Sequence, residues 1–296
     1  HGVKRWITRY KFRRYKCQTC EATFFPEQRC WGRSKVGSEL VAYALYQNIG
    51  LRLPTESVTG ALNKLFGFHL PLGTTSAIKR AAAMDYEESY NSLITRLCSG
   101  QLLHVDETKV SVKGVTGFVW VFANLEEVAY IYSETREGDL LDALLKDFTG
   151  VLVSDFYAAY DGIRCSQQKC LIHLIRDLNE DVLKHPYDGE LKRLAQTFAG
   201  LVRPMVETVD RHGLKSHFLR KHRSSVDRFY RQLAAVALQS EAAVKLRNRL
   251  QKNEEKLFTF LSHDGVPWNN NKAEHAGKAF ATLRKVIGGA STEKGI

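Results

Sequence analysis

Gly150-Val-Leu-Val-Ser-Asp155 is a short apolar run that ends in an acid. Such a run is typical of a strand in a parallel sheet, because both faces of that strand are covered. Three apolar stretches before it predict strands linked by hairpins, over 102–112, 115–125 and 128–133. A helix over 137–148 precedes the run, and a short strand near 168–170 follows it and leads into a helix ending near Lys184. We therefore expect an α/β core built on a mixed sheet.

Helical patterns lie on both sides of this core. Residues 187–261 are long, polar and almost free of Gly and Pro after Pro204, which predicts an all-helical insertion. The stretch from Gly37 to Leu97 is also helical, and we expect its last part, 74–97, to be one long helix. The pattern of two short helices and a turn before a longer helix is typical of a helix-turn-helix DNA-binding motif. It is equally typical of an ordinary small helical bundle.

The positive charge of the chain is concentrated at its start. The 296 residues carry a formal net charge of +11, of which +8 belongs to residues 1–36. Basic positions alternate there with aromatic ones, a combination suited to phosphates and to stacking. We expect nucleic acid as the partner, with Arg13, Arg14 and Lys16 among the DNA contacts, and the alternative is a solvated basic tail.

The same segment contains Cys17-Gln-Thr-Cys20, the spacing of half a tetrahedral zinc site. We interpret residues 1–30 as the second half of a zinc ribbon that binds Zn²⁺ through Cys17 and Cys20. The site is incomplete, since only His1 and Cys30 stand nearby as further ligands and their spacing is poor. The alternative is a pair of buried, inert cysteines.

Composition excludes several classes of protein. With 44% hydrophobic residues the chain can bury a core, which excludes disorder over its bulk, and its length suggests two domains or one domain with an insertion. No run approaches eighteen apolar residues and no signal segment opens the chain, so we expect no membrane span and a cytoplasmic protein. Six cysteines in a chain of this length indicate a reducing compartment rather than a disulfide scaffold.

Three acids stand out by context: Asp106 within the first strand, Asp155 at the end of the apolar run, and Glu274 near the start of the last helix. Acids on adjacent buried strands repel one another, and a divalent cation resolves that repulsion. Magnesium suits such a site because it binds a few carboxylates, waters and phosphate oxygens. Taken singly, Asp155 is equally a helix cap, and Asn271 with Glu274 loosely fits a capping box. Glu107 is an alternative to Asp106 as the acid of the site. Neighbouring residues on a strand point to opposite faces, so only one of the two can face the site.

At these residues the sequence resembles the insertion-sequence 66 group of bacterial DDE transposases. The resemblance covers nearly the whole chain, and its most specific block runs from Asp264-Gly-Val-Pro to Asn271-Lys-Ala-Glu274-His275. The other matching segments are His104-Val-Asp106-Glu-Thr108, Ser154-Asp155 with Tyr157 and Tyr160, Cys170-Leu-Ile-His173, Arg284-Lys285 and Gly288-Gly289. The stretch Asn269-Asn270-Asn271 departs from the family, which usually places an acid before the two Asn.

The resemblance implies an RNase H-like core, interrupted by the helical insertion, with Asp106, Asp155 and Glu274 as the metal triad. It implies two Mg²⁺ or Mn²⁺ ions, one activating a water and then a 3′-hydroxyl while the other stabilises the leaving oxygen. The partners would be transposon ends and target DNA, and the enzyme a nucleoid-associated homodimer or higher oligomer. We expect these segments: a zinc-ribbon-like basic arm (1–30), a helical DNA-binding or linker region (31–100), the first part of the core (101–186), the insertion (187–262) and the last part of the core with Glu274 (263–296).

Several neighbours of the triad are expected to support it. Lys278 and Lys285 lie within about 40° of Glu274 on a helix, where they would hold DNA phosphates. His104 shares a strand face with Asp106, although a hydrogen-bonded core histidine is the simpler interpretation. Cys170 and His173 have half a metal-site spacing, and Asn271 lies at the start of the last helix.

Two further expectations complete this interpretation. The family has a first zinc knuckle upstream and continues downstream, so we expect both ends of the chain to be truncated. The alternatives to a transposase are a catalytically silent DNA-binding regulator on the same scaffold and an RNase H-like nuclease without strand transfer.

Overall fold

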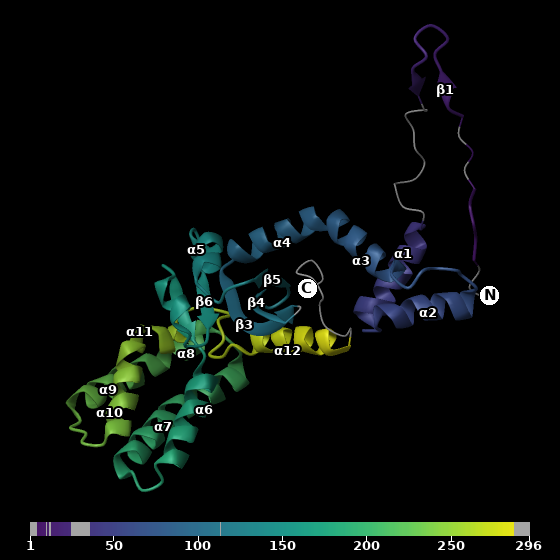
Figure 1. Cartoon of the computed structure of the whole chain (residues 1–296). Helices are drawn as coiled ribbons and strands as arrows, with labels where there is room; N and C mark the ends of the chain where they lie inside the picture. The colour runs from purple at the N-terminus through teal and green to yellow at the C-terminus, as the bar shows by residue number, and fades with distance from the viewer. Residues whose placement is uncertain (1–4, 10, 12, 25–35, 113, 287–296) are drawn as a thin grey trace. The chain divides into compact units, whose positions relative to one another are not determined.

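The computed structural model describes residues 5–9, 11, 13–24, 36–112 and 114–286 (Figure 1). They divide into two compact units: one holds the described residues up to Tyr86 and those from Leu283 onward, and the other is Glu87–Thr282. Across these ranges every helix is too short or too polar to cross a bilayer.

A small hairpin opens the described chain. Strand β1 (Tyr15–Lys16) pairs antiparallel with β2 (Thr23–Phe24), and the turn between them carries Cys17 and Cys20. Glu21 lies in this turn with a φ of 57°, in the left-handed region. The hairpin fits half of a zinc ribbon, whose other expected residues, His1 and Cys30, lie outside the described residues.

Three helices and a π-helical turn follow. They are α1 (Ser38–Leu45), the turn at Tyr46–Gly50, α2 (Thr55–Phe66) and α3 (Thr74–Asp85). Their apolar faces meet in a core of Ala44, Val58, Leu62 and Ile78. Helix α2 ends at Gly67, whose φ of 64° only glycine adopts without strain. The helix-turn-helix interpretation stays a prediction.

The single helix expected over 74–97 is wrong. The chain forms α3 and then α4 (Glu87–Cys98), separated at Tyr86. The apolar residues Leu93, Ile94 and Leu97 of α4 pack on the core of the sheet, so this helix belongs with the strands. The two compact units divide after Tyr86.

The sheet has five strands in the order β5-β4-β3-β6-β7. Strands β3, β4 and β5 pair antiparallel, whereas β6 and β7 extend the sheet with parallel pairings. Their bounds are β3 (Leu102–Val112), β4 (Val115–Ala123), β5 (Val128–Ser133), β6 (Val151–Ser154) and β7 (Ser166–Lys169). The expectation of a mixed sheet in an α/β core is confirmed.

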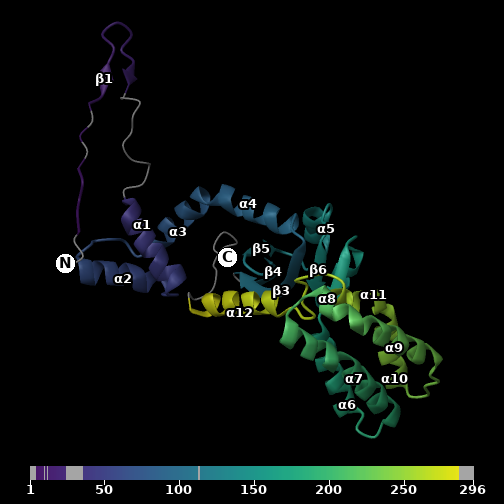
Figure 2. The same ribbon diagram turned by 180° about the vertical axis from the view of Figure 1, so that it is seen from behind.

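Helices cover both faces of this sheet (Figures 1 and 2). On one face, Leu103, Val105 and Trp120 pack under α4 and α5 (Asp139–Leu145); we call it the α4/α5 face. On the other, Val110 and Phe280 share a cluster, and Phe280 comes from α12 (Asn271–Val286); we call it the α12 face. Successive residues of β3 alternate between the two faces, so His104 and Asp106 lie on the α12 face.

The remaining helices form a layer whose core is continuous with the sheet. Buried residues of this layer pack with Val151 and Val153 of β6. Between Gly189 and Leu261 every regular element is helical, as the sequence indicates. The elements are α6 (Leu171–Lys184), α7 (Gly189–His212), α8 (Ser216–Leu219), α9 (Arg223–Ala235), α10 (Glu241–Lys252), α11 (Glu254–Leu257) and 3-10 turns at Ala158–Gly162, Arg220–His222 and Thr259–Leu261.

A buried ion pair joins the helical layer to the sheet. Lys169, at the end of β7, is 1% exposed, and its Nζ lies 3.4 Å from Asp161 and 3.2 Å from the hydroxyl of Ser154. Burial lowers the pKa of Lys169, since it disfavours the charged form. Lys256 of α11 donates to the same Asp161 carboxylate at 2.8 Å, so sheet and helices share one anion. Removing that anion would leave a buried cation unpaired, a strongly destabilising change.

Candidate active site

Two of the three acids come from neighbouring strands. Asp106 lies within β3 opposite Val121 of β4, and Asp155 follows directly after β6. Strands β3 and β6 run parallel, with His104 paired to Val153. Two residues further along are Asp106, within β3, and Asp155, directly after β6, so the parallel register places the two acids at the same level on adjacent inner strands of the sheet.

The third acid comes from the first turn of α12. Glu274 donates its backbone N–H to the carbonyl of Asn270 at 3.1 Å, and its side chain is 16% exposed. The charges of the other two acids also affect Asp106. The pKa of Asp106 is raised from 3.8 to about 7, first by burial and then by the charge of Glu107, with Asp155 and Glu274 adding to it. The fold thus gathers acids from three distant parts of the chain.

Glu107 faces away from this group, as strand alternation predicts. Its side chain is 3% exposed on the α4/α5 face, where Arg136 donates to it at 2.8 Å and the Tyr160 hydroxyl also donates to it. Burial raises the pKa of Tyr160 well above its usual range, and Glu107 adds to that effect. Glu107 is therefore a structural anion.

Aromatic residues after Asp155 connect this anion to the site. Asp155 accepts the backbone N–H of Tyr157 at 2.8 Å, while the Tyr157 hydroxyl donates to the carbonyl of Arg136. The Arg136 guanidinium lies 4.0 Å from the centroid of the Tyr157 ring. The turn that holds Asp155 is thereby tied to the Arg136–Glu107 pair behind Asp106.

Asn270 joins the strand of Asp106 to the helix of Glu274. It is fully buried, and its side-chain NH₂ donates to the carbonyl of Val105 at 2.9 Å. Its Oδ1 lies 3.0 Å from Nδ1 of His104, and its backbone N–H donates to Sγ of Cys170 at 3.2 Å. Three consecutive asparagines cannot be told apart by sequence, and the expected supporting residue is the neighbouring Asn271.

Asn271 lies at the start of the last helix, as expected, but it is not the cap of that helix. It opens α12, and its own backbone N–H is capped by Oδ1 of Asn269 at 3.1 Å. The cap of the helix is thus upstream of Asn271, and the capping box of Asn271 with Glu274 is wrong. The asparagine of this loop that hydrogen-bonds to the strand of Asp106 is Asn270.

His104 is a neutral histidine with one free nitrogen. Burial lowers the pKa of His104 to about 4, so the imidazole is uncharged. Because the Asn270 NH₂ is used by Val105, Asn270 accepts a hydrogen bond from Nδ1 of His104. Nε2 then carries a lone pair, and among the described residues this buried atom has no hydrogen-bond partner.

Cys170 and His173 lie beside Glu274. Cys170 is the N-cap residue of α6, and Nδ1 of His173 lies 3.6 Å from Oε1 of Glu274. The ligand atoms of these three residues lie within 4.8 Å of one another, and this is the one group of three or more Cys, His, Asp or Glu with that property in the described chain. Both expected supporting residues, Cys170 and His173, are therefore near the third acid.

Comparison with known proteins now decides the family. A profile described as the transposase IS66 family matches residues 33–296. The chain belongs to this family. A comparison with curated proteins finds no match.

Membership in the transposase family sets the general function, an enzyme of the transposase type with DNA as its partner. The resemblance deduced from the Asp264–His275 block is confirmed. The match spans both compact units, including the four helices, α1 to α4, that precede the sheet. The roles of individual residues of the transposase rest on the geometry above.

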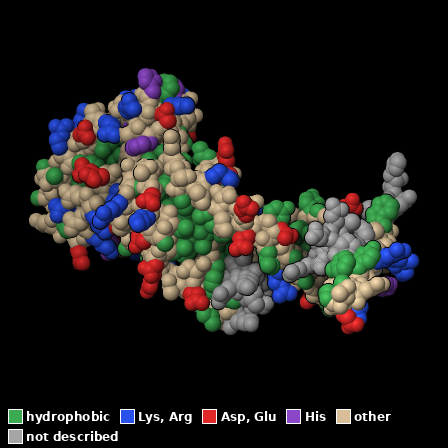
Figure 3. Space-filling view, turned by 90° about the horizontal axis from the view of Figure 1, so that it is seen from above, with side chains coloured by type: hydrophobic (Ala, Val, Ile, Leu, Met, Phe, Trp, Pro, Cys, Tyr) green, Lys and Arg blue, Asp and Glu red, His purple; other side chains and the backbone are tan. Residues whose placement is uncertain are grey.

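The basic residues named as DNA contacts are exposed in the transposase. Arg13, Arg14 and Lys16 lie in or beside the β1 strand, and Lys16 forms a surface ion pair with Glu21 at 3.1 Å. On α12, Lys278 and Lys285 are also exposed, in contrast to Glu274. Figure 3 shows basic and acidic side chains interspersed on one face of the molecule, in keeping with the near-balance of charge beyond residue 36.

The two N-terminal cysteines of the transposase are accessible. The pKa of Cys17 is lowered to about 7 by backbone N–H groups of Cys20 and Thr19, with a further hydrogen bond to the Cys20 side chain. A knuckle that binds a metal uses the same backbone donors to stabilise thiolates. The alternative of buried, inert cysteines is wrong, since Cys20 is exposed and Cys17 half-buried.

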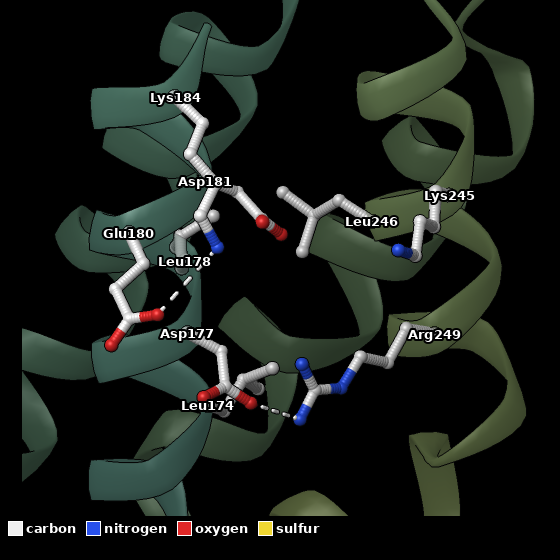
Figure 4. Close-up of a pocket in the computed structure, with 9 residues that line it drawn as sticks. All are labelled: Leu174, Asp177, Leu178, Glu180, Asp181, Lys184, Lys245, Leu246 and Arg249. Carbon is white, nitrogen blue, oxygen red and sulfur yellow. Dashed lines mark hydrogen bonds and ion pairs between the residues drawn. The ribbon is translucent and has the colours of Figure 1, made fainter.

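A hollow in the helical layer of the transposase contains none of the three acids. It measures about 240 Å³ and lies between α6 and α10 (Figure 4). Its charged lining is largely paired, with Arg249 2.7 Å from Asp177 and Lys184 3.7 Å from Glu180. The Arg249–Asp177 pair bridges the two helices, whereas the Lys184–Glu180 pair lies within α6.

The raised pKa of Asp106 makes the stability of the metal-free transposase depend on pH. The unfolded carboxyl ionises near 3.8 and the folded one near 7, so stability is lost as pH rises between these values. The gap corresponds to at most about 4 kcal/mol. Urea unfolding in chelator at pH 5 and pH 8 measures this, with Asp106→Asn expected to flatten the profile and the exposed Asp142→Asn to leave it unchanged. Identical profiles for wild type and Asp106→Asn would contradict the assignment.

Proposed function

We propose that the protein is a DNA transposase that cleaves transposon ends and joins them to target DNA, with Asp106, Asp155 and Glu274 as its metal ligands. The observation that carries the proposal is the placement of Asp106 on β3, of Asp155 directly after the neighbouring parallel strand β6, and of Glu274 in the first turn of α12. Burial and, to a smaller extent, the charges of Asp155 and Glu274 raise the pKa of Asp106, in keeping with this placement. Buried carboxylates without countercharges are unfavourable, and a divalent cation offsets that cost.

The residues present fit hard divalent ions. The donors of the triad are carboxylate oxygens, the ligands that Mg²⁺ and Mn²⁺ prefer. Oε1 of Glu274 is buried and accepts no hydrogen bond from the described residues, so it has a lone pair to offer. Bound as two ions, Mg²⁺ or Mn²⁺ would activate the attacking hydroxyl and stabilise the leaving oxygen.

The chain itself contributes positioning. Asp106 is fixed on a central strand, and Asp155 is fixed by the N–H of Tyr157. Asn270 sets the start of α12 against β3 and so places Glu274 on the same side of the sheet. Lys278, one turn beyond Glu274, would hold a DNA phosphate beside the acids.

We further propose that the sheet is an RNase H-like core and that the other segments bind DNA. Support comes from three antiparallel strands extended by two parallel ones, with the acids on β3, after β6 and on the last helix. In this interpretation residues 1–30 form the zinc-binding basic arm, and residues 31–100 form the DNA-binding or linker region. The core consists of residues 101–186 and 263–296, and residues 187–262 are the insertion between its two parts. Because two ends must be joined, the working form would be a dimer or higher oligomer at the nucleoid.

The deciding experiment uses plasmid DNA carrying both ends of the element that encodes the chain. We expect nicking at the ends with Mg²⁺ or Mn²⁺, and joining of pre-cut ends to a second plasmid. Asp155→Asn and Glu274→Gln should abolish both reactions while retaining DNA binding.

Each alternative function gives a different outcome. DNA binding without strand breaks under any metal condition would indicate a silent regulator. Cleavage without joining of pre-cut ends would indicate an RNase H-like nuclease. Either result would overturn the proposed strand transfer.

A further inference from the structure

A cluster of three unlike ligands lies at the N-terminus of α6. Sγ of Cys170, a ring nitrogen of His173 and a carboxylate oxygen of Glu274 all lie within 4.8 Å of one another. Nδ1 of His173 and Oε1 of Glu274 are buried, 3.6 Å apart, and neither atom forms a hydrogen bond within the described residues. Buried polar atoms normally have partners, so such a pair indicates a group that binds between them.

The backbone fixes this cluster from two sides. Cys170 and His173 lie three residues apart at the start of one helix, which places them on one face of it. The loop before α12 is held against the same helix, since Leu171 donates to the carbonyl of Trp268 at 2.9 Å and Asn270 donates to Sγ of Cys170. Glu274 follows in the first turn of α12. The three ligands are therefore preorganised by elements from distant parts of the chain.

We propose that Cys170, His173 and Glu274 form a binding site for a borderline-soft divalent cation, of which Zn²⁺ is the best fit. A thiolate, an imidazole and a carboxylate are zinc ligands, and three of them leave a fourth position open. Magnesium and manganese favour oxygen and would gain little from the sulfur. In a tetrahedron with bonds of about 2.0–2.1 Å, a nitrogen and an oxygen ligand lie about 3.3 Å apart. The observed 3.6 Å between His173 and Glu274 is close to that value.

The site shares Glu274 with the proposed metal triad. The effect of zinc on cleavage that follows from this sharing rests on the proposed function. Zinc bound between Cys170 and His173 would hold Glu274 on the α6 side, away from Asp106 and Asp155. On binding, the thiol proton of Cys170 passes to solvent and the sulfur becomes the metal ligand. Zinc would therefore inhibit cleavage by competing with magnesium for one carboxylate.

The test measures metal binding rather than cleavage. It uses the full chain with Cys17→Ser and Cys20→Ser, which removes the N-terminal pair, and titrates Co²⁺ as a coloured substitute for Zn²⁺. We expect one equivalent to bind with thiolate-to-cobalt absorption, which added Zn²⁺ then removes. Cys170→Ser in this background should abolish the absorption. His173→Ala and Glu274→Gln should each weaken zinc binding at least about tenfold.

Two matched variants separate this site from others. Cys165→Ser replaces a half-buried thiol outside the cluster and should retain the absorption. Asp106→Asn should retain zinc binding while losing magnesium-dependent cleavage, so failure of the proposed function would not remove the zinc site. Thermal unfolding of each variant checks that it is folded. The His173 side chain is partly exposed, so His173→Ala tests the site with little change to the core.

Two results would overturn the proposal. One is the lack of thiolate absorption in the Cys17→Ser/Cys20→Ser protein. The other is absorption that survives both Cys170→Ser and His173→Ala, which would assign the metal to other residues.

Discussion

Replacing Asp106 by Asn is expected to reduce metal-dependent cleavage of end-containing DNA on the order of 10³-fold or more. Asn is the same size and keeps the strand intact, but it removes the negative charge that a divalent cation needs. The same change removes a buried charge that repels Asp155 and Glu274. The metal-free variant should therefore be at least as stable as the wild-type protein at pH 8. Loss of activity together with unimpaired stability distinguishes a ligand from a structural residue.

The measurement is single-turnover nicking at saturating Mg²⁺, with DNA binding and urea unfolding followed on the same preparations. Asp142→Asn, an exposed acid on α5, is the matched control and should cleave at the wild-type rate. Cleavage by Asp106→Asn within a few-fold of wild type would remove Asp106 from the triad.

Replacing Asn270 by Ala should give the second large effect, on stability and activity together. The change leaves the Nδ1–H of His104 and the carbonyl of Val105 buried without their partner. Each unsatisfied group costs about 1–3 kcal/mol, so we expect about 3 kcal/mol of destabilisation. Glu274 would also lose its anchor to β3, and misplacement by about 1 Å can cost about 100-fold in rate.

Asn271→Ala is the control for this prediction, because it removes the same side chain one residue along. Its side chain forms no hydrogen bond with the described residues, and we expect less than about 0.5 kcal/mol of destabilisation. Urea unfolding and single-turnover nicking of the two variants provide the comparison. Equal effects of Asn270→Ala and Asn271→Ala would show that Asn270 is not the anchor.

Regular elements with strong local patterns could be predicted from the sequence. Strand 128–133 was predicted to the residue, and the run ending at Asp155 is the parallel strand β6. The break between α3 and α4 could not be predicted, since Tyr86 is neither Gly nor Pro and helical periodicity continues through it. Leu97 of the second helix packs on the sheet, a tertiary contact that local periodicity does not encode.

The acids could be proposed from the sequence, whereas their supports could not. Asp155 follows from the end of an apolar strand, Asp106 from its place within the first strand, and Glu274 from the family block. Which of three consecutive asparagines is buried depends on the angle at which α12 meets β3, and no local pattern encodes that angle. The same holds for His173, whose closeness to Glu274 joins residues 101 positions apart.

The contact between His104 and Asn270 spans 166 residues of chain. During synthesis, β3 is complete long before the loop that holds Asn270 leaves the ribosome, and domains fold as their last segments emerge. A nascent chain that has not reached α12 carries two acids and lacks the third. Under the proposed function, a nascent chain therefore could not break DNA before α12 has been made.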